Sequence, residues 1–184
     1  MEIRDILMQH GVQTRIVPCE LEIAFCALNA ENEQACKKEY LSLSQHRYGS
    51  IAQWLNKNKS RIEDTDEVLL ELLMELYHKV EHIEQILLDK GTQYLPLPAE
   101  GVADFVGHGV VCMPQDVFEN GQKYYLRIFL PIFPQRYIGV FAHAISPKIV
   151  LFRQIHHKDQ VDFDSFVVQM ERVMILDSKT SIKE

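Results

Sequence analysis

The side chains best suited to bind a metal ion in this chain are its histidines. His78 and His82 stand four residues apart in a predicted helix, a spacing that places both imidazoles on one face and can hold zinc. They do not belong to an HExxH motif, so we expect solvated helix residues instead. His156 and His157 are adjacent, and in a strand they would face opposite sides of the sheet. We predict no metal site and no cofactor, with a metal-dependent enzyme as the disfavoured alternative.

The cysteines are the next candidates for metal or redox chemistry. The chain has four, Cys19, Cys26, Cys36 and Cys112. No two of them form a CxxC pair, so the sequence contains neither a zinc ribbon nor a thioredoxin-like motif. In a reducing compartment we expect free and mostly buried thiols.

No segment carries a complete catalytic signature. The serines occur in no nucleophile elbow, and VGHG at 106–109 is too short for a phosphate-binding loop. His108 lies between two glycines in a predicted turn, where it either contacts a ligand or tolerates an unusual backbone angle. Carboxylates are abundant, but nothing places two of them together in a cleft. We expect a protein that is not an enzyme.

Composition excludes several classes of partner. The 184 residues are 47% hydrophobic and 24% charged, which is typical of a globular protein. The formal net charge of -7 disfavours nucleic acid and anionic membrane surfaces as partners. No apolar run is long enough to span a bilayer, and the N-terminal residues lack an apolar secretory core. We expect a cytoplasmic protein.

The elements that position these residues change in kind at Gly91. Before it, residues 20–28 alternate as a strand does, residues 31–47 form a polar helix, and residues 66–90 form a long helix. After Gly91, short β-like runs are separated by turn residues, which is typical of an antiparallel barrel or sandwich. A last helix, about residues 159–176, carries apolar residues at helical spacing and is predicted to cover an open end of the barrel.

The long helix carries a heptad pattern. Apolar residues separated by alternating steps of four and three form the seam, Leu69, Leu73, Leu76, Val80, Ile83 and Leu87. Flanking apolar residues widen the stripe, Leu70, Leu72, Tyr77 and Ile86. The stripe either packs on the chain's own barrel or joins subunits. We prefer a homo-oligomer, a dimer or tetramer, because the helix is longer than a small barrel needs.

The segment DFVGHGVVCMPQDVFENGQKYYLRIFLP, residues 104–131, resembles the PilZ domain. Asp104 and Gly109 occupy the first and last places of that family's second signature, and Val106 stands where serine is expected. Gly121 and the alternating YYLRIFLP strand also fit. The resemblance implies a six-stranded barrel with a closing helix, in a family whose typical members bind cyclic di-GMP. A competing register places Gly101 at the signature glycine and retains less of the motif.

The first PilZ signature is RxxxR, in a loop before the barrel, where two guanidinium groups grip phosphates. No two arginines here lie four residues apart, and the nearest imitation is Lys57 with Arg61. With Val106 also lacking a hydroxyl, the resemblance implies a degenerate ligand site around Asp104, Val106, His108, Gly109 and Arg136. The alternative is a genuine cyclic di-GMP receptor in which other arginines substitute, such as Arg127, Arg136 or Arg153.

We therefore predict an α+β protein in which a helical region with one long coiled-coil-like helix precedes an antiparallel six-stranded PilZ-like barrel and a C-terminal helix. The expected parts are a strand and short helices in 1–64, the oligomerisation helix in 65–91, the barrel and closing helix in 92–176, and a flexible tail in 177–184. The predicted function is an oligomeric regulatory scaffold in bacterial cyclic di-GMP signalling or motility. Its loops, including LPIFPQR at 130–136, would face a protein partner through Phe133 and Arg136.

Overall fold

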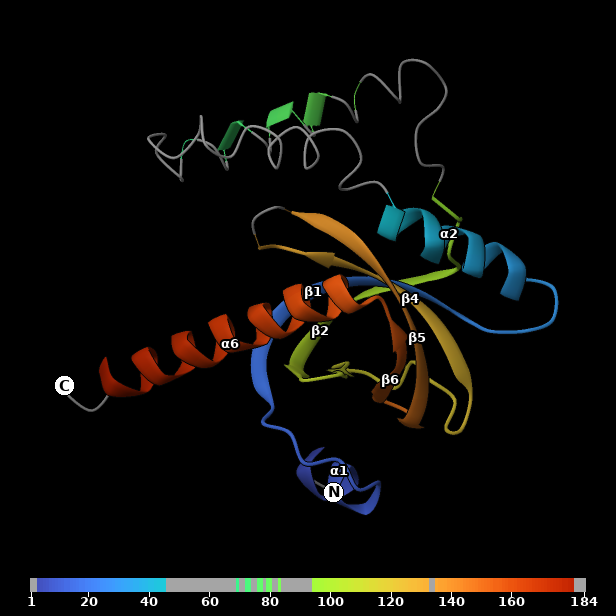
Figure 1. Cartoon of the computed structure of the whole chain (residues 1–184). Helices are drawn as coiled ribbons and strands as arrows, with labels where there is room; N and C mark the ends of the chain where they lie inside the picture. The colour runs from blue at the N-terminus through green and yellow to red at the C-terminus, as the bar shows by residue number, and fades with distance from the viewer. Residues whose placement is uncertain are drawn as a thin grey trace.

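The structure is a computed structural model of the chain. It describes residues 3–45, 94–132 and 135–180 (Figure 1), together with eight helical residues between the first two ranges, Leu69, Leu72, Leu73, Leu76, Tyr77, Lys79, Val80 and Ile83. The elements in chain order are α1 (Ile3–Gln9), β1 (Val17–Ala27), α2 (Glu33–Gln45), β2 (Ala99–Gly107), β3 (Val110–Cys112), β4 (Lys123–Leu130), β5 (Arg136–Ser146), β6 (Ile149–Ile155) and α6 (His157–Thr180).

The six strands form one closed antiparallel barrel in the order β1-β2-β3-β6-β5-β4. This confirms the predicted antiparallel barrel, its strand number and the helix that follows it. The predicted polar helix at 31–47 is also confirmed as α2. The C-terminal helix is longer than predicted, because it continues to Thr180.

The predicted boundary of the barrel at residue 92 is wrong. Only five of the strands follow that residue, and the sixth is β1. Ile23 of β1 pairs with Gly101 of β2 on one side and with Ile128 of β4 on the other. Without β1 the sheet would have two open edges, so the barrel includes residues 17–27, and residues 28–98 connect two neighbouring strands of it.

Alternating apolar side chains fill the interior of the barrel. The β4 strand shows the pattern most clearly, with the fully buried residues Leu126, Ile128 and Leu130. Helix α6 lies across the barrel (Figure 1) and adds three side chains to the same core, Phe163, Phe166 and Val167. Val173, on the predicted apolar face of this helix, is exposed instead. The closing helix thus covers the barrel mainly with its first half.

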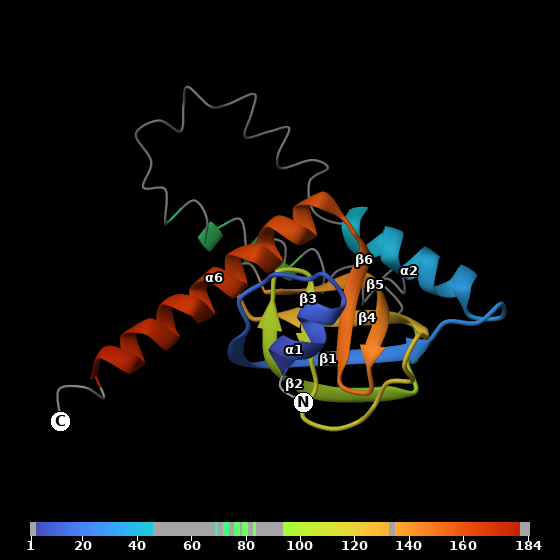
Figure 2. The same ribbon diagram turned by 90° about the horizontal axis from the view of Figure 1, so that it is seen from below.

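Two smaller apolar clusters attach the N-terminal helices to the outside of the barrel. Helix α1 lies against the outside of the barrel (Figure 2), and its Leu7 packs against β3 and β6 residues, which include Val110, Ile149 and Leu151. Cys36 and Tyr40 of α2 pack against Cys26 and Tyr125. Gly139 gives α2 room to approach, because a Cβ there would lie 2.8 Å from the Tyr125 hydroxyl oxygen and 3.3 Å from the Tyr40 Cα.

The thiols behave as predicted. Cys26, Cys36 and Cys112 are buried, Cys19 is half-buried, and all four are free. Burial is the main reason that the pKa of Cys36 and of Cys112 rises to about 12. Such thiols are poor nucleophiles, which agrees with a structural role.

The eight described residues of the predicted long helix are all helical. Five of the six seam residues are among them, and each is more than half exposed: Leu69, Leu73, Leu76, Val80 and Ile83. Leu87, His78, His82, Lys57 and Arg61 lie outside the described residues. No helix in the described part of the chain is both long enough and apolar enough to cross a membrane.

Candidate functional site

Strand β2 and the turn that follows it hold four of the five predicted site residues. Asp104 lies in β2, and His108 and Gly109 form the turn itself. Gly109 has a φ of 72°, a left-handed conformation that favours glycine. The His108 Nδ1 lies 2.7 Å from Asp164 Oδ1, so this contact joins the turn to α6. The structure therefore brings the turn together with the first half of the closing helix.

The chain before β1 packs directly on this turn. The His108 amide donates a hydrogen bond to the Thr14 hydroxyl over 3.1 Å. A Cβ on Gly107 would lie 2.7 Å from the Arg15 carbonyl oxygen, so only glycine permits the approach. Arg15 is exposed beside the turn. We call residues 14–16, 107–109 and Asp164 the turn site.

Arg15 is a functional candidate that the sequence reasoning missed. The segment that directly precedes Val17, the first residue of the barrel, contains Arg15. Gly11 stands four residues before Arg15, so this segment does not form an RxxxR pattern. The signal was available: the β-like runs after Gly91 supply only five strands, and the alternating segment at 20–28 was the remaining candidate for a sixth.

Two of the predicted site residues are too buried to offer much of their side chains to a ligand at the surface. Val106 is fully buried in the barrel core, so its side chain does not contribute to a surface site. Asp104 is half-buried, and its Oδ1 atom has no hydrogen-bond partner among the described residues. After burial itself, the Asp104 carboxylate is the next cause of the raised pKa of Cys112. Asp104 therefore faces the thiols as much as the solvent.

Arg136 is not a free interface residue, and that prediction is corrected. Its guanidinium donates to the carboxylates of both Asp159 and Asp162 in the first turns of α6. The Arg136 side chain is only 10% exposed, and that of Asp159 is 4% exposed. Two carboxylates neutralise the guanidinium, so Arg136 is a poor phosphate ligand and joins β5 to α6 instead. Phe133, its predicted companion, lies outside the described residues.

Arg127 is also engaged inside the protein. Its Nη1 atom lies 3.1 Å from Glu39 Oε2 of α2 and donates to the Leu95 carbonyl over 3.0 Å. The guanidinium also lies over the rings of Tyr94 and Tyr137, 5.0 and 5.7 Å from their centroids. Among the arginines considered as substitutes for the missing motif, Arg153 alone is exposed.

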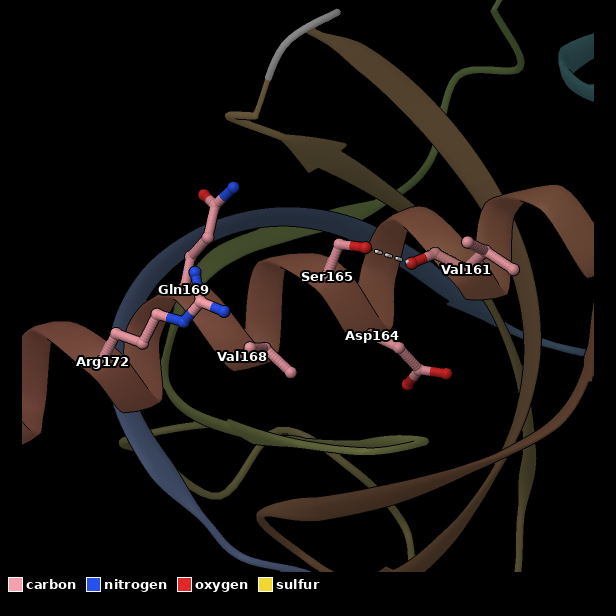
Figure 3. A pocket seen from close by; sticks show the side chains of 6 residues that line it. All are labelled: Val161, Asp164, Ser165, Val168, Gln169 and Arg172. Atoms are coloured by element: carbon pink, nitrogen blue, oxygen red, sulfur yellow. Dashed lines mark hydrogen bonds between the residues drawn. The ribbon is translucent and has the colours of Figure 1, made fainter.

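A shallow hollow of about 460 Å³ runs along α6 beside the turn site. Figure 3 shows the side chains that line it, all from one face of the helix: Val161, Asp164, Ser165, Val168, Gln169 and Arg172. The Ser165 hydroxyl donates to the Val161 carbonyl over 2.8 Å, so it is satisfied within the helix. Asp164 belongs both to this hollow and to the contact with His108, so the two features form one surface.

The described residues offer no cluster of three or more His, Cys, Asp or Glu side chains arranged to hold a metal ion. His156 stacks on the Tyr40 ring with centroids 4.0 Å apart, and His157 is exposed at the first position of α6. His156 therefore packs against an aromatic ring and His157 contacts solvent. The turn site therefore offers Arg15, an imidazole and a backbone turn, but no nucleophile with an adjacent base.

In comparisons with protein-family models, with curated proteins and with solved structures, nothing matches this chain.

Proposed function

We propose that this protein is a non-enzymatic, PilZ-like scaffold that self-associates through its central helix and works in bacterial cyclic di-GMP signalling or motility. The observation that carries the proposal is the exposure of the seam. Leu69, Leu73, Leu76, Val80 and Ile83 are 52 to 59% exposed in the single chain, although their spacing is that of a helix-to-helix interface. Contiguous apolar surface of this kind marks interaction sites in globular proteins.

The energetics favour burial of this stripe between subunits. Moving one leucine or isoleucine side chain from water into a protein interior contributes about 1.5–3 kcal/mol. Several half-exposed side chains on one face add to a substantial driving force, which offsets part of the entropy lost on association. Leu72, at 56% exposed, widens the stripe beyond a two-stranded seam and supports assembly as a dimer or a tetramer.

Three features of the barrel support the proposal of a degenerate ligand site. Arg127 and Arg136 are held in internal ion pairs, and Val106 lies in the core. These three observations leave the turn site with fewer ligand groups than the PilZ signatures supply. The cytoplasmic location and the signalling system come from the resemblance and the composition, and a protein partner on the barrel loops completes the proposal.

Two measurements test the proposal. Sedimentation equilibrium of the wild-type chain is expected to give the mass of a dimer or a tetramer, and a mass of one chain at micromolar concentration contradicts self-association. Calorimetry with cyclic di-GMP is expected to show no binding. Micromolar or tighter binding contradicts the degenerate site.

Arg15 favours a second candidate, a genuine cyclic di-GMP receptor with an unusual arginine arrangement. This exposed guanidinium lies in the loop before the barrel, next to the turn that carries Gly109. If this candidate is correct, calorimetry will detect cyclic di-GMP binding that Arg15→Ala abolishes. Arg4→Ala is the matched control, because Arg4 is an exposed arginine of α1 and its loss removes the same charge from the same end of the chain.

A further inference from the structure

A groove on the outside of the barrel lies between the first turns of α2 and the strands β4, β5 and β6. Figure 1 shows α2 alongside this part of the barrel, and the groove has a volume of about 420 Å³. That volume falls within the range of small-molecule sites. The groove shares no residue with the turn site or with the described part of the central helix, so it is separate from both, although it contains Arg153, one of the arginines considered for the cyclic di-GMP alternative.

The groove is a cationic region in an acidic protein. Lys37, Lys123 and Arg153 line it, and Glu33 is the one carboxylate among its described lining residues. Lys37 Nζ lies 2.6 Å from Glu33 Oε1. That hydrogen bond and the charge of Lys37 lower the pKa of Glu33, with a smaller contribution from Lys123. Three cations against one carboxylate leave a positive excess, in a chain whose net charge is -7.

A β-bulge aims Arg153 into the groove. Phe141 of β5 pairs with Gln154 of β6, whereas the next residue, Ala142, pairs with Phe152, so Arg153 is the extra residue of the bulge. Phe152 and Ile155 both pack against the barrel core. Both residues between them are therefore turned outward, and Arg153 and Gln154 are exposed side by side. In regular alternation only one of the two would face the groove.

The strand residues beside Arg153 add apolar and aromatic surface to the groove. Phe141 is half-buried, and its ring lies 5.1 Å from the Tyr40 ring and 5.3 Å from the Tyr125 ring, measured between centroids. Leu28 adds a second apolar side chain to the lining. His143 pairs directly with Lys123 across β4 and β5, so the two side chains leave the sheet on the same face at neighbouring positions. The groove therefore offers aromatic surface for a flat ring of a ligand and positive charge for an anionic group.

We propose that this groove binds a phosphate-bearing small molecule of about nucleotide size. Arg153 and Lys123 bind the phosphate, with His143 as a further donor, and Phe141 contacts the ring. A guanidinium fork is well suited to phosphate because it donates two parallel hydrogen bonds. Among the described residues no carboxylate pairs with Arg153 or Lys123, whereas Arg127 and Arg136 are already neutralised. The groove is a small hollow, which favours a small molecule over an acidic peptide.

The test is an NMR titration of the full-length chain with GMP, guanosine and inorganic phosphate. We expect GMP to shift the amide signals of His143 and Arg153, and to bind at least about tenfold more tightly than guanosine or phosphate. Arg153→Gln and Lys123→Gln should each weaken GMP binding about tenfold. Lys38 is an exposed lysine of α2 that does not line the groove, so Lys38→Gln should leave GMP binding unchanged. Raising the salt concentration should weaken binding as well.

Several outcomes would overturn this assignment. One is that neither GMP nor AMP at millimolar concentration shifts the amide signals of groove residues. Another is that both glutamine variants bind GMP as tightly as the wild type does. A third is that inorganic phosphate binds as tightly as GMP. A hexaglutamate peptide that binds more tightly than GMP would also overturn it, in favour of an acidic protein partner. Circular dichroism of the two variants distinguishes a lost ligand from a lost fold.

Discussion

Glu39 and Arg127 form a buried ion pair that joins α2 to β4, with Arg127 Nη1 3.1 Å from Glu39 Oε2. The Tyr125 hydroxyl donates to Glu39 Oε1 over 2.9 Å, and the Leu95 amide donates to Oε2. Leu95 is the second residue of the described chain after the central helix. One carboxylate therefore holds α2 and residue 95 on the same patch of the barrel, so both ends of the connection between them are anchored there.

Replacing Glu39 with glutamine is expected to lower the free energy of unfolding by about 3–5 kcal/mol. The side chains of Glu39 and Arg127 are 3% and 14% exposed, so the substitution leaves a buried guanidinium without its counter-charge. Urea denaturation measures the loss. The neighbouring exposed Lys38→Gln is the control, with a change within about 0.5 kcal/mol. Equal losses of unfolding free energy in the two variants would show that the ion pair does not stabilise the fold.

Leu76→Asp and Ile83→Asp are expected to convert the proposed oligomer to single chains. Each places a carboxylate in an apolar interface, where an unpaired charge is strongly disfavoured. Sedimentation equilibrium gives the mass of each variant. Val173→Asp is the matched control, because Val173 is similarly exposed on α6, 49% against 55% for Ile83. A wild-type mass retained in both seam variants would exclude this stripe as the interface.

Arg136→Ala is expected to loosen the attachment of α6 to the barrel. It leaves the buried Asp159 carboxylate without its cation, at a cost of about 3–5 kcal/mol in the free energy of unfolding. Hydrogen exchange should then speed up at the amides around Phe163 and Phe166. The comparison is Asp164→Asn, which alters the more exposed contact with His108 and should cost less than about 1 kcal/mol. Unchanged exchange in α6 would refute the proposed link.

The Cys112 thiol is expected to make stability fall with rising pH in alkaline solution. Burial, followed by the charge of Asp104, raises its pKa from 9.0 to about 12 in the folded chain. Below pH 9 the thiol is protonated in both states and contributes no pH dependence. Between about pH 9 and 12 the unfolded chain releases the proton and the folded chain retains it, so stability falls by about 1.4 kcal/mol per pH unit.

The check compares urea denaturation of the wild type and Cys112→Ala at several pH values between 8 and about 10.5, within the window set by the pKa shift. The variant loses packing at every pH, but its slope against pH should be shallower by the contribution of one thiol. Parallel slopes would show that Cys112 ionises alike in both states.

Local patterns predicted the elements well, and long-range pairing explains what they missed. The alternation in β4 and the helical spacing in α6 are properties of neighbouring residues, so both elements were predicted from sequence. The membership of β1 in the barrel depends on partners beyond residue 98, which no local pattern displays. The same holds for Arg136: its residue type suggested an interface, but only the fold brings Asp159 and Asp162 to it.

The turn site shows the same division. Gly109 was expected in a turn, and its positive φ agrees with that. Arg15 was overlooked because its significance depends on knowing where the barrel begins. Val106 was placed by motif position, yet its side chain faces the core, a direction that depends on the irregular pairing of β1 and β2 between Pro18 and Leu21. Bulges of this kind change which side chains face outward, and the sequence does not announce them.

The distance along the chain between β1 and its two partners also has a consequence for biosynthesis. During translation β1 leaves the ribosome long before β2, and β4 follows later still. Until residue 130 has been synthesised, β1 cannot pair with both β2 and β4, and some of its backbone groups stay unpaired. Joining strands so far apart in sequence is slow, because a long loop must close before any pairing stabilises it. The barrel therefore cannot close around β1 until β4 has been synthesised.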